Sequence, residues 1–223
     1  ALPYGTDTWQ VATLAREATL RANGNGARVL CLPVQPVSLN NNFHAFPYAC
    51  RMSVATFMAL LRDLIDLFQG EGVRRILVLN GHGGNPDVIR AVQRDLADHE
   101  GLFLGLVDFG TLVILRNHDL WDDHADHAGE EESSCMLHLR PDLVRPDALG
   151  PRPVNQPALA CLRDGTVQFV RPWHRYLPES AGGDASRASA GKGRQAMESG
   201  VAELARVLGE ISAAPDTDGF PYL

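Results

Sequence analysis

Residues 80–85 of this chain, Asn-Gly-His-Gly-Gly-Asn, constrain its fold more than any other stretch. They follow a short apolar run at 75–79 that contains β-branched residues and is typical of a buried strand. They precede a segment that begins at Pro86, a residue favoured at the first position of a helix. The six residues are therefore predicted to turn from the carboxyl end of a strand into a helix, which is the edge where open α/β sheets bind ligands.

The glycines of this turn let the backbone bend sharply and leave the imidazole of His82 exposed at the strand tip. Two interpretations follow from the pattern. The turn could be a glycine-rich anion cradle at a helix N-terminus, or it could hold His82 as a metal ligand. We favour the metal ligand, because a phosphate-binding loop has no need of a central histidine flanked by asparagines. The residues after His82 are expected to line the substrate side of the site, namely Gly83, Gly84 and Asn85.

Helix and strand signals alternate along the rest of the chain. Helical periodicity covers 8–23, 54–68, 86–99, 135–139 and 189–212, and apolar runs predict buried strands at 28–34, 75–79 and 102–107. A long irregular loop is expected between the last of these strands and residue 122. Strands that alternate with helices predict an α/β fold with a mostly parallel sheet covered on both faces, formed as a single domain over residues 1–223.

The net charge and the cysteines of the chain indicate which binding partners and which cellular compartment to expect. A net charge of −7 argues against nucleic acid or an anionic membrane as the main partner. The sequence has no apolar run of membrane-spanning length, and its first residues lack the features of a signal peptide. The four cysteines form no CxxC pair; Cys31, in the run 28–34, and Cys135 are expected to be buried free thiols. We therefore expect a cytoplasmic protein.

A second chemical signal lies at 126–132, Asp-His-Ala-Gly-Glu-Glu-Glu. It puts His127 at a helix entry and Glu132 one turn into that helix. Carboxylates also favour a first helical turn because of the helix dipole, so one or two of the three glutamates are expected to be simply solvated. Together with the His82 turn, however, histidine and carboxylate side chains form a ligand set that suits zinc, manganese or iron.

The two segments together resemble the creatininase (creatinine amidohydrolase) family, whose members carry NGHGGN and HAGxxET/S-type motifs in this order. Three other stretches agree with the family pattern. Residues 2–7 resemble its LPxGTD turn, and residues 182–193 resemble its GDP…AS…KG tail. Residues 33–47, which end in His-Ala-Phe-Pro, resemble its loop with a histidine before FPG. The resemblance covers nearly the whole chain.

The resemblance implies a three-layer α/β/α sandwich that cleaves amide C–N bonds with two divalent ions of zinc, manganese or iron. On the matching positions, Asp7 would bridge the two ions, while His82 would ligate one of them and Glu132 the other. Metal ions polarise the amide carbonyl and activate water, and His127 would carry a proton to the leaving nitrogen. His44 would line the substrate pocket, although an ordinary exposed loop histidine is an equal alternative. A homo-oligomer, a hexamer or a dimer, is also implied.

The chain departs from the family pattern in three places. The Glu-x-His motif that precedes the LPxGTD turn is absent, so we expect an N-terminal strand and a Glu-x-His segment to be missing from the given sequence. FPGT has become Phe-Pro-Tyr-Ala at 46–49, which alters a loop on the substrate side. Gly84 stands where creatinine hydrolases have an additional glutamate, which argues against creatinine as the substrate.

Three functional hypotheses remain open. The favoured one is a metal-dependent amidohydrolase acting on a small-molecule amide, which could be a cyclic amide, a formamide or a small peptide. The second is a catalytically impaired family member that serves as a small-molecule binder or scaffold, motivated by the absent Glu-x-His. The third treats residues 81–84 as a phosphate cradle and predicts nucleotide-dependent thermal stabilisation that a chelator does not affect.

Overall fold

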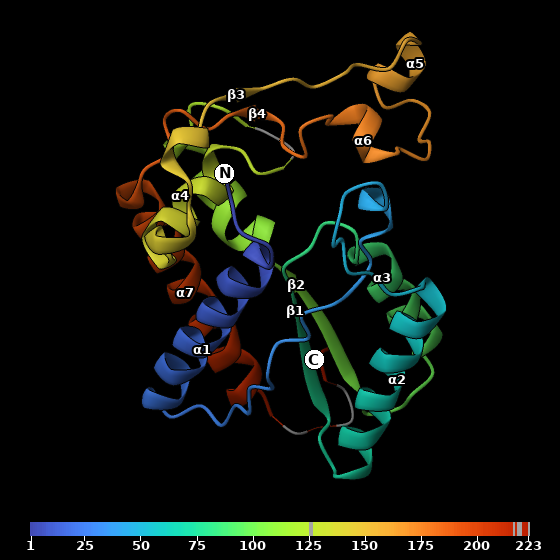
Figure 1. The fold of residues 1–223 in the computed structure, drawn as a ribbon. Coiled ribbons are helices and arrows are strands. Elements are labelled where there is room, and N and C mark those ends of the chain that lie inside the picture. Colours follow the sequence, from blue (N-terminus) through green and yellow to red (C-terminus); the bar gives the residue numbers. More distant parts are fainter. Residues whose placement is uncertain (125–126, 216, 218–219, 223) are drawn as a thin grey trace. The chain divides into compact units, whose positions relative to one another are not determined.

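The structure is a computed structural model that describes residues 1–124, 127–215, 217 and 220–222 (Figure 1). The chain divides into two compact units, which we name by their main elements and describe one at a time. The sheet unit comprises Asp7–Leu39, Met52–His118 and Gln195–Leu223. The α4 unit comprises Ala1–Thr6, Asn40–Arg51 and Asp119–Arg194.

The sheet unit is built on a parallel pair of strands, β1 (Arg75–Asn80) and β2 (Phe103–Asp108). The pairing register places the last residues of the two strands, Asn80 and Asp108, opposite each other. Parallel neighbours need a crossover connection, and helix α3 (Pro86–Asp95) supplies it. The predicted strand–turn–helix unit is therefore confirmed, although α3 ends at Asp95 and not near residue 99.

Helices cover both faces of this strand pair, as predicted for a three-layer α/β fold (Figure 1). On one side lie α2 and α3, and on the other lie α1 and the part of α7 that belongs to the sheet unit. The bounds of the long helices are Thr6–Gly24 for α1, Val54–Gly70 for α2 and Ala190–Ala213 for α7. The periodic apolar residues in these segments predicted the helices because each needs one apolar face for the sheet.

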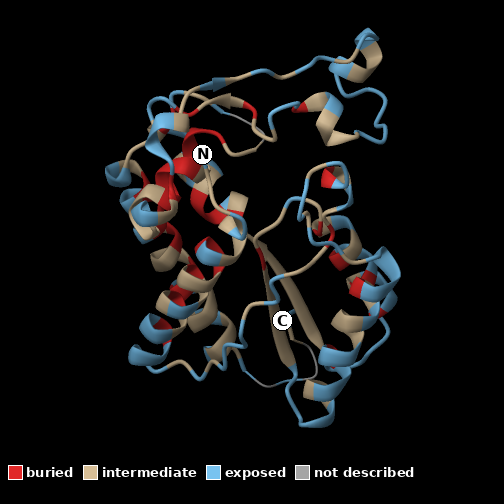
Figure 2. Cartoon of the chain, viewed as in Figure 1, coloured by how far each residue is buried: buried red, intermediate tan, exposed pale blue. Residues whose placement is uncertain are grey.

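Two apolar clusters hold α2 and α3 to the strands, and Figure 2 shows their buried positions. In the first cluster, Phe57 of α2 packs with Ile89 of α3 and with Leu39. In the second, Ile65 of α2 packs with Val92 of α3, next to apolar side chains of both strands. Burying side chains of this size contributes roughly 1.5–3 kcal/mol each, so these clusters fix the layer on which residues 80–85 are mounted.

The α4 unit is centred on α4 (Glu130–Leu139) and contains little sheet. A short antiparallel pair joins β3 (Pro151–Arg152) to β4 (Gly183–Asp184). The remaining elements of this unit are short helical turns: η1 at Asn41–Phe43, η4 at Pro141–Leu143, η5 at Pro146–Ala148, α5 at Ala160–Arg163 and α6 at Trp173–Tyr176.

The prediction of a buried strand at 28–34 is wrong. None of these residues is in a strand, and Leu30 is 76% exposed. Side chains bind the backbone groups that a neighbouring strand would use. Asn23 accepts from the backbone N–H of Val29 at 2.9 Å and donates to its carbonyl at 3.0 Å, while Ser212 accepts from Arg28 at 2.9 Å. Strand propensity depends on structural context. Here the side chains of Asn23 and Ser212 make the hydrogen bonds that a neighbouring strand would otherwise make.

The irregular loop expected before residue 122 is instead largely helical. It forms a π-helical turn, η2 (Gly110–Ile114), and a kinked 3₁₀ segment, η3 (Leu115–Leu120). Val113 of η2 is fully buried in the sheet unit. Packing of this side chain therefore stabilises the helical turn, although the sequence here shows no clear amphipathic periodicity. No helix among the described residues is long and apolar enough to cross a membrane.

We expect iodoacetamide to alkylate Cys31 and Cys50 in the native protein and to spare Cys135. The first two thiols are exposed, which corrects the prediction that Cys31 is buried, whereas Cys135 is completely buried as predicted. Burial also raises the pKa of the Cys135 thiol, so little of the reactive thiolate forms. Peptide mass spectrometry with and without denaturant measures this. Equal labelling rates for Cys31 and Cys135 in the native protein would contradict the structure.

Candidate functional site

The first predicted pair of site residues, Asp7 and His82, is in direct contact within the sheet unit. Asp7 lies in the first turn of α1, and His82 follows β1. Its Nδ1 atom is 2.9 Å from Asp7 Oδ2, and its Nε2 atom is 2.9 Å from the carbonyl oxygen of Leu39. Both side chains are partly open to solvent, with 21% exposure for His82 and 35% for Asp7. A ligand can therefore reach the pair.

A network of side-chain amides fixes the turn that presents His82. Asn80 donates to the backbone carbonyl of His82 at 2.9 Å and to Asp108 Oδ2 at 2.7 Å. Asn85 donates to Asn80 Oδ1 at 3.0 Å and accepts from the backbone N–H of Leu39 at 3.2 Å. Both asparagines are buried. Sequence reasoning missed Asp108, although its place at the carboxyl end of the neighbouring strand could have indicated it.

The position of Asn85 bears on its predicted role in substrate binding. Both ends of its amide are engaged inside the turn, with Asn80 and with Leu39. Gly83, in contrast, has open space where a side chain would stand, whereas Gly84 is pressed against the carbonyl oxygen of Leu39. The open side of the turn is thus at Gly83.

Replacing Gly84 with alanine is expected to destabilise the protein by about 2 kcal/mol, because overpacking forces the backbone to move. A Cβ atom at this position would lie 2.5 Å from the Leu39 carbonyl oxygen and 2.9 Å from His82 Nε2. Gly83→Ala is the matched control, since a Cβ there meets nothing within 4 Å. It should change the free energy of unfolding by less than about 0.5 kcal/mol. Urea denaturation compares the two variants, and equal stabilities would contradict the packing.

The contacts of His82 fit the chemistry of a metal ligand. A carbonyl oxygen only accepts, so Nε2 carries the hydrogen and donates to Leu39. Metal-ligating histidines commonly bind a carbonyl with the nitrogen that does not face the metal. Nδ1 then faces the carboxylate of Asp7, and two acceptors at 2.9 Å need a proton or a cation between them. Imidazole nitrogen and carboxylate oxygen are donors that suit zinc and manganese.

The second predicted pair, His127 and Glu132, lies in the α4 unit. His127 Nδ1 is 3.8 Å from Glu132 Oε2. The same carboxylate oxygen accepts from the backbone N–H of Ala128, so Glu132 folds back over the start of α4 as a helix cap does. Ala128 has a φ of +50°, a conformation that costs energy for a residue with a side chain. Asp126, the first residue of this motif, lies outside the described residues.

Aromatic rings surround the imidazole of His127. The ring centroids of Phe43 and Trp173 lie 4.9 Å and 5.3 Å from it. Phe43 and Trp173 also pack on each other at 4.7 Å. His127 remains 28% exposed, so it can exchange a proton with a ligand while its ring is held in place. His44, the predicted pocket residue, lies next to this cluster: it is exposed and packs edge-on against His174 at 5.3 Å.

The prediction that one or two of residues 130–132 are simply solvated is wrong. Glu130 is fully buried, Glu131 is 4% exposed, and the side chain of Glu132 is 24% exposed. Burial, together with the nearby charge of Glu132, raises the pKa of Glu131 to about 7. His124 Nδ1 lies 3.8 Å from the Glu131 carboxylate. The start of α4 therefore concentrates carboxylates in a partly desolvated place, as functional sites often do.

Lys192, the only lysine of the sequence, neutralises the buried Glu130. Its ammonium group donates to Glu130 and, at 2.6 Å, to Asp122. The hydrogen bond from Lys192 lowers the pKa of Asp122, and the hydrogen bond to Asp122 raises the pKa of Lys192. Glu130 also accepts from the backbone N–H groups of Asp122 and Asp123, at 2.7 and 2.9 Å. This network ties the segment before His127 to α4.

Among the described residues, no group of three or more histidine, cysteine, aspartate or glutamate side chains is close enough together to hold a metal ion. The structure brings together Asp7 with His82 in the sheet unit and His127 with Glu132 in the α4 unit. Each pair supplies one imidazole and one carboxylate.

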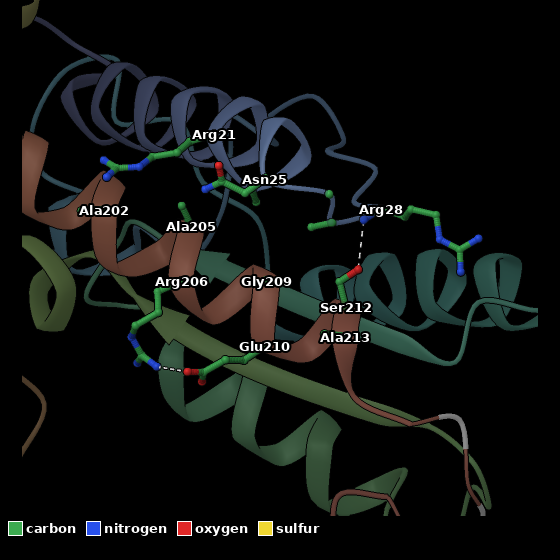
Figure 3. A pocket seen from close by; sticks show the side chains of 13 residues that line it. Arg21, Asn25, Arg28, Ala202, Ala205, Arg206, Gly209, Glu210, Ser212 and Ala213 are labelled. Atoms are coloured by element: carbon green, nitrogen blue, oxygen red, sulfur yellow. Dashed lines mark hydrogen bonds and ion pairs between the residues drawn. The ribbon is translucent and has the colours of Figure 1, made fainter.

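A cavity of about 610 Å³ lies elsewhere in the sheet unit, between the end of α1 and α7 (Figure 3). Arginines and small residues line it, but Arg206 is already paired with Glu210 across one turn of α7. None of the predicted site residues lines this cavity. We therefore base the function on the two histidine–carboxylate pairs.

Comparison with known proteins gives a consistent result. The family model described as "Creatininase: Creatinine amidohydrolase" matches residues 1–208. A creatinine amidohydrolase of Pseudomonas putida is 31% identical over 124 residues, which are 48% of this chain and 46% of that enzyme. The chain thus spans about half the length of this relative. A mycofactocin precursor peptide peptidase of Mycobacterium ulcerans is 27% identical over 96% of this chain and 81% of its own length.

Solved structures agree with the α/β fold. A Bacteroides fragilis protein classed with the creatinine amidohydrolases superposes with a TM-score of 0.83 at 27% identity, over 96% of this chain and 85% of that one. A mutant creatininase of Zn–Zn type superposes with a TM-score of 0.75 at 21% identity, over 96% of this chain and 85% of its own. At that identity, the second comparison concerns the fold alone.

Proposed function

The chain belongs to the creatininase family, and from this premise we propose that it is a metal-dependent hydrolase of amide C–N bonds. The observation that carries the proposal is the contact between Asp7 and His82, in which Leu39 holds the imidazole with Nδ1 toward the carboxylate. The relatives support this class of reaction, since both a creatinine amidohydrolase and a peptide peptidase break amide bonds.

In this proposal, Asp7, His82 and Glu132 hold two divalent ions of zinc, manganese or iron. When bound, such ions polarise the amide carbonyl and lower the pKa of a water molecule. The solved creatininases of Zn–Zn and manganese type support a divalent metal. The protein itself holds the Asp7 carboxylate and the His82 imidazole at a fixed separation. It does so through the hydrogen bonds of Asn80, which fix the turn that carries His82.

His127 donates the proton that the leaving nitrogen needs. An imidazole is suited to this because it exchanges its proton near neutral pH. The rings of Phe43 and Trp173 restrict its rotation, and Glu132 faces its Nδ1 atom at 3.8 Å. The proton would then leave from Nε2, the nitrogen on the opposite side of the ring.

Substrate contacts come from the open side of the His82 turn and from the loop that carries His44. We assign Gly83 and His44 to the substrate side. We assign Gly84, which packs against Leu39, and Asn85, whose side chain is engaged with Asn80, to the support of the turn. Gly84 offers no carboxylate to a cyclic guanidine such as creatinine. We propose a formamide or a small peptide as substrate. The homo-oligomer and the cytoplasmic location implied at the sequence level remain predictions.

Metal removal and reconstitution test the proposed function. The protein is dialysed against a chelator and then titrated with Zn²⁺ or Mn²⁺, while elemental analysis measures metal per chain and a panel of formamides and short peptides measures hydrolysis. We expect the chelated protein to be inactive and activity to return in proportion to bound metal. If the chain binds neither metal tightly, or if hydrolysis is the same with and without metal, the proposal is wrong.

A further inference from the structure

A groove in the α4 unit borders the ring cluster around His127. It has a volume of about 420 Å³, within the usual range for small-ligand sites. Its walls come from η1 and from the segment that leads into α6, and they include His44, Phe169, Arg171 and Trp173. Trp173 forms part of the groove and also packs 5.3 Å from the His127 ring. One aromatic ring thus separates the groove from the proposed proton donor.

The charge of the groove is opposite to that of the protein as a whole. The chain carries a net charge of −7. Among the described residues that line the groove, however, none is aspartate or glutamate, whereas Arg171 and His44 supply positive or protonatable groups. The side chains of Asn41 and Asn42 add neutral hydrogen-bonding groups. Such a lining favours a negatively charged ligand group.

Aromatic contacts hold the guanidinium of Arg171. Its central carbon lies 4.9 Å from the ring centroid of Tyr176 and 6.0 Å from that of Trp173. Contacts of this kind are cation–π interactions, in which the ring attracts the guanidinium charge. The N–H groups lie at the edge of the plane, and two of them match the two oxygens of a carboxylate. Arg171 is thus placed to recognise a carboxylate rather than to act as a diffuse positive charge.

Apolar residues complete the chemistry of the groove. Val170 is 89% exposed and Phe169 is 43% exposed, so the lining of the groove offers apolar surface to a ligand. A ligand that carries both an apolar side chain and a carboxylate would bury part of this surface and meet Arg171 at the same time.

We propose that this groove binds the carboxylate of the amide substrate and that Arg171 is a specificity-determining residue. The substrates would then be N-acyl amino acids or short peptides with a free carboxylate and an apolar side chain. Creatinine and simple formamides lack the carboxylate. This inference rests on the proposed function, because it assumes that the ligand in the groove is the molecule whose amide bond is cleaved.

Calorimetric titration of the full chain after metal removal tests the groove without hydrolysis. The probes are N-acetyl-phenylalanine and N-acetyl-leucine, each compared with its own C-terminal amide. We expect the wild-type protein to bind each carboxylate about tenfold more tightly than the matched amide. Arg171→Gln should remove this preference, and Arg171→Lys should restore part of it because the charge returns without the planar edge. Arg175→Gln is the matched control, since Arg175 is an exposed arginine on α6, a few residues after Arg171, and does not line the groove.

The possible outcomes separate the two proposals. A wild-type protein that binds the carboxylates no better than the amides would overturn the groove assignment, as would a preference that survives in Arg171→Gln or disappears in Arg175→Gln. None of these results depends on metal or on turnover. Failure of metal reconstitution would instead overturn the proposed function and leave the carboxylate preference intact. If the preference is present and the metal-loaded enzyme cleaves the carboxylate probes faster than their amides, both proposals are supported.

Discussion

Replacing His82 with alanine is expected to lower metal-dependent amide hydrolysis, measured as kcat/KM, by about a thousandfold or more. The imidazole of His82 contacts the carboxylate of Asp7, and its Nδ1 atom is 2.9 Å from Asp7 Oδ2. Alanine removes the nitrogen donor and leaves Asp7 without its neighbour. The variant should therefore bind less metal per chain than the wild type at equal free metal concentration.

Metal content and activity have to be measured together, with thermal unfolding as a check on folding. Asp7→Asn should have the same effect as His82→Ala, because it weakens the other member of the pair. His99→Ala is the matched control: His99 is an exposed histidine four residues beyond the end of α3, and its loss should change neither metal content nor kcat/KM. A folded His82→Ala protein with wild-type metal content and activity would refute the assignment of the site.

Replacing Lys192 with methionine is expected to destabilise the protein by about 3 kcal/mol. The substitution keeps the aliphatic stem but removes the ammonium group, so that the carboxylate of Glu130 is left fully buried without a positive partner. Removing one partner of a buried ion pair costs more than the pair itself contributes, because the remaining charge stays desolvated. The free energy of unfolding in urea measures this loss.

Two further variants separate this explanation from a general loss of charge. The double substitution Lys192→Met with Glu130→Gln should recover much of the loss, because a neutral amide can still accept from the backbone N–H groups of residues 122 and 123. Arg206→Met removes the ion pairs that the exposed Arg206 side chain makes with Glu203 and Glu210 along α7. It should cost less than about 1 kcal/mol. If Lys192→Met costs no more than Arg206→Met, the buried pair does not stabilise the fold.

The local signals in the sequence identified most of the sheet unit. The apolar run at 75–79 became β1, and the proline after residue 85 begins α3. The turn between them was predicted because glycine-rich sequence, strand pattern and helix pattern meet within a few residues. The approach of Asp7 to His82 was implied by family resemblance, and the structure shows the contact at 2.9 Å.

Structural features that depend on residues far apart in the sequence could not be predicted from local sequence patterns. Residues 28–34 have the composition of a strand, but Asn23 and Ser212 take the backbone groups of Arg28 and Val29. The three glutamates at 130–132 resembled an ordinary acidic first turn. Their burial depends on α4 packing in its unit and on Lys192, which lies some sixty residues further along the chain.

The sequence by itself determined the α/β class, the strand–turn–helix unit and the histidines and carboxylates to consider, because periodicity, turn chemistry and side-chain type are local properties. The tertiary structure decided which of these groups are buried, what Lys192 and Arg171 contact, and which rings hold His127. Burial and charge pairing are properties of neighbours brought together by folding. The same glutamate is a solvated helix cap or a buried ion-pair partner according to what packs against it.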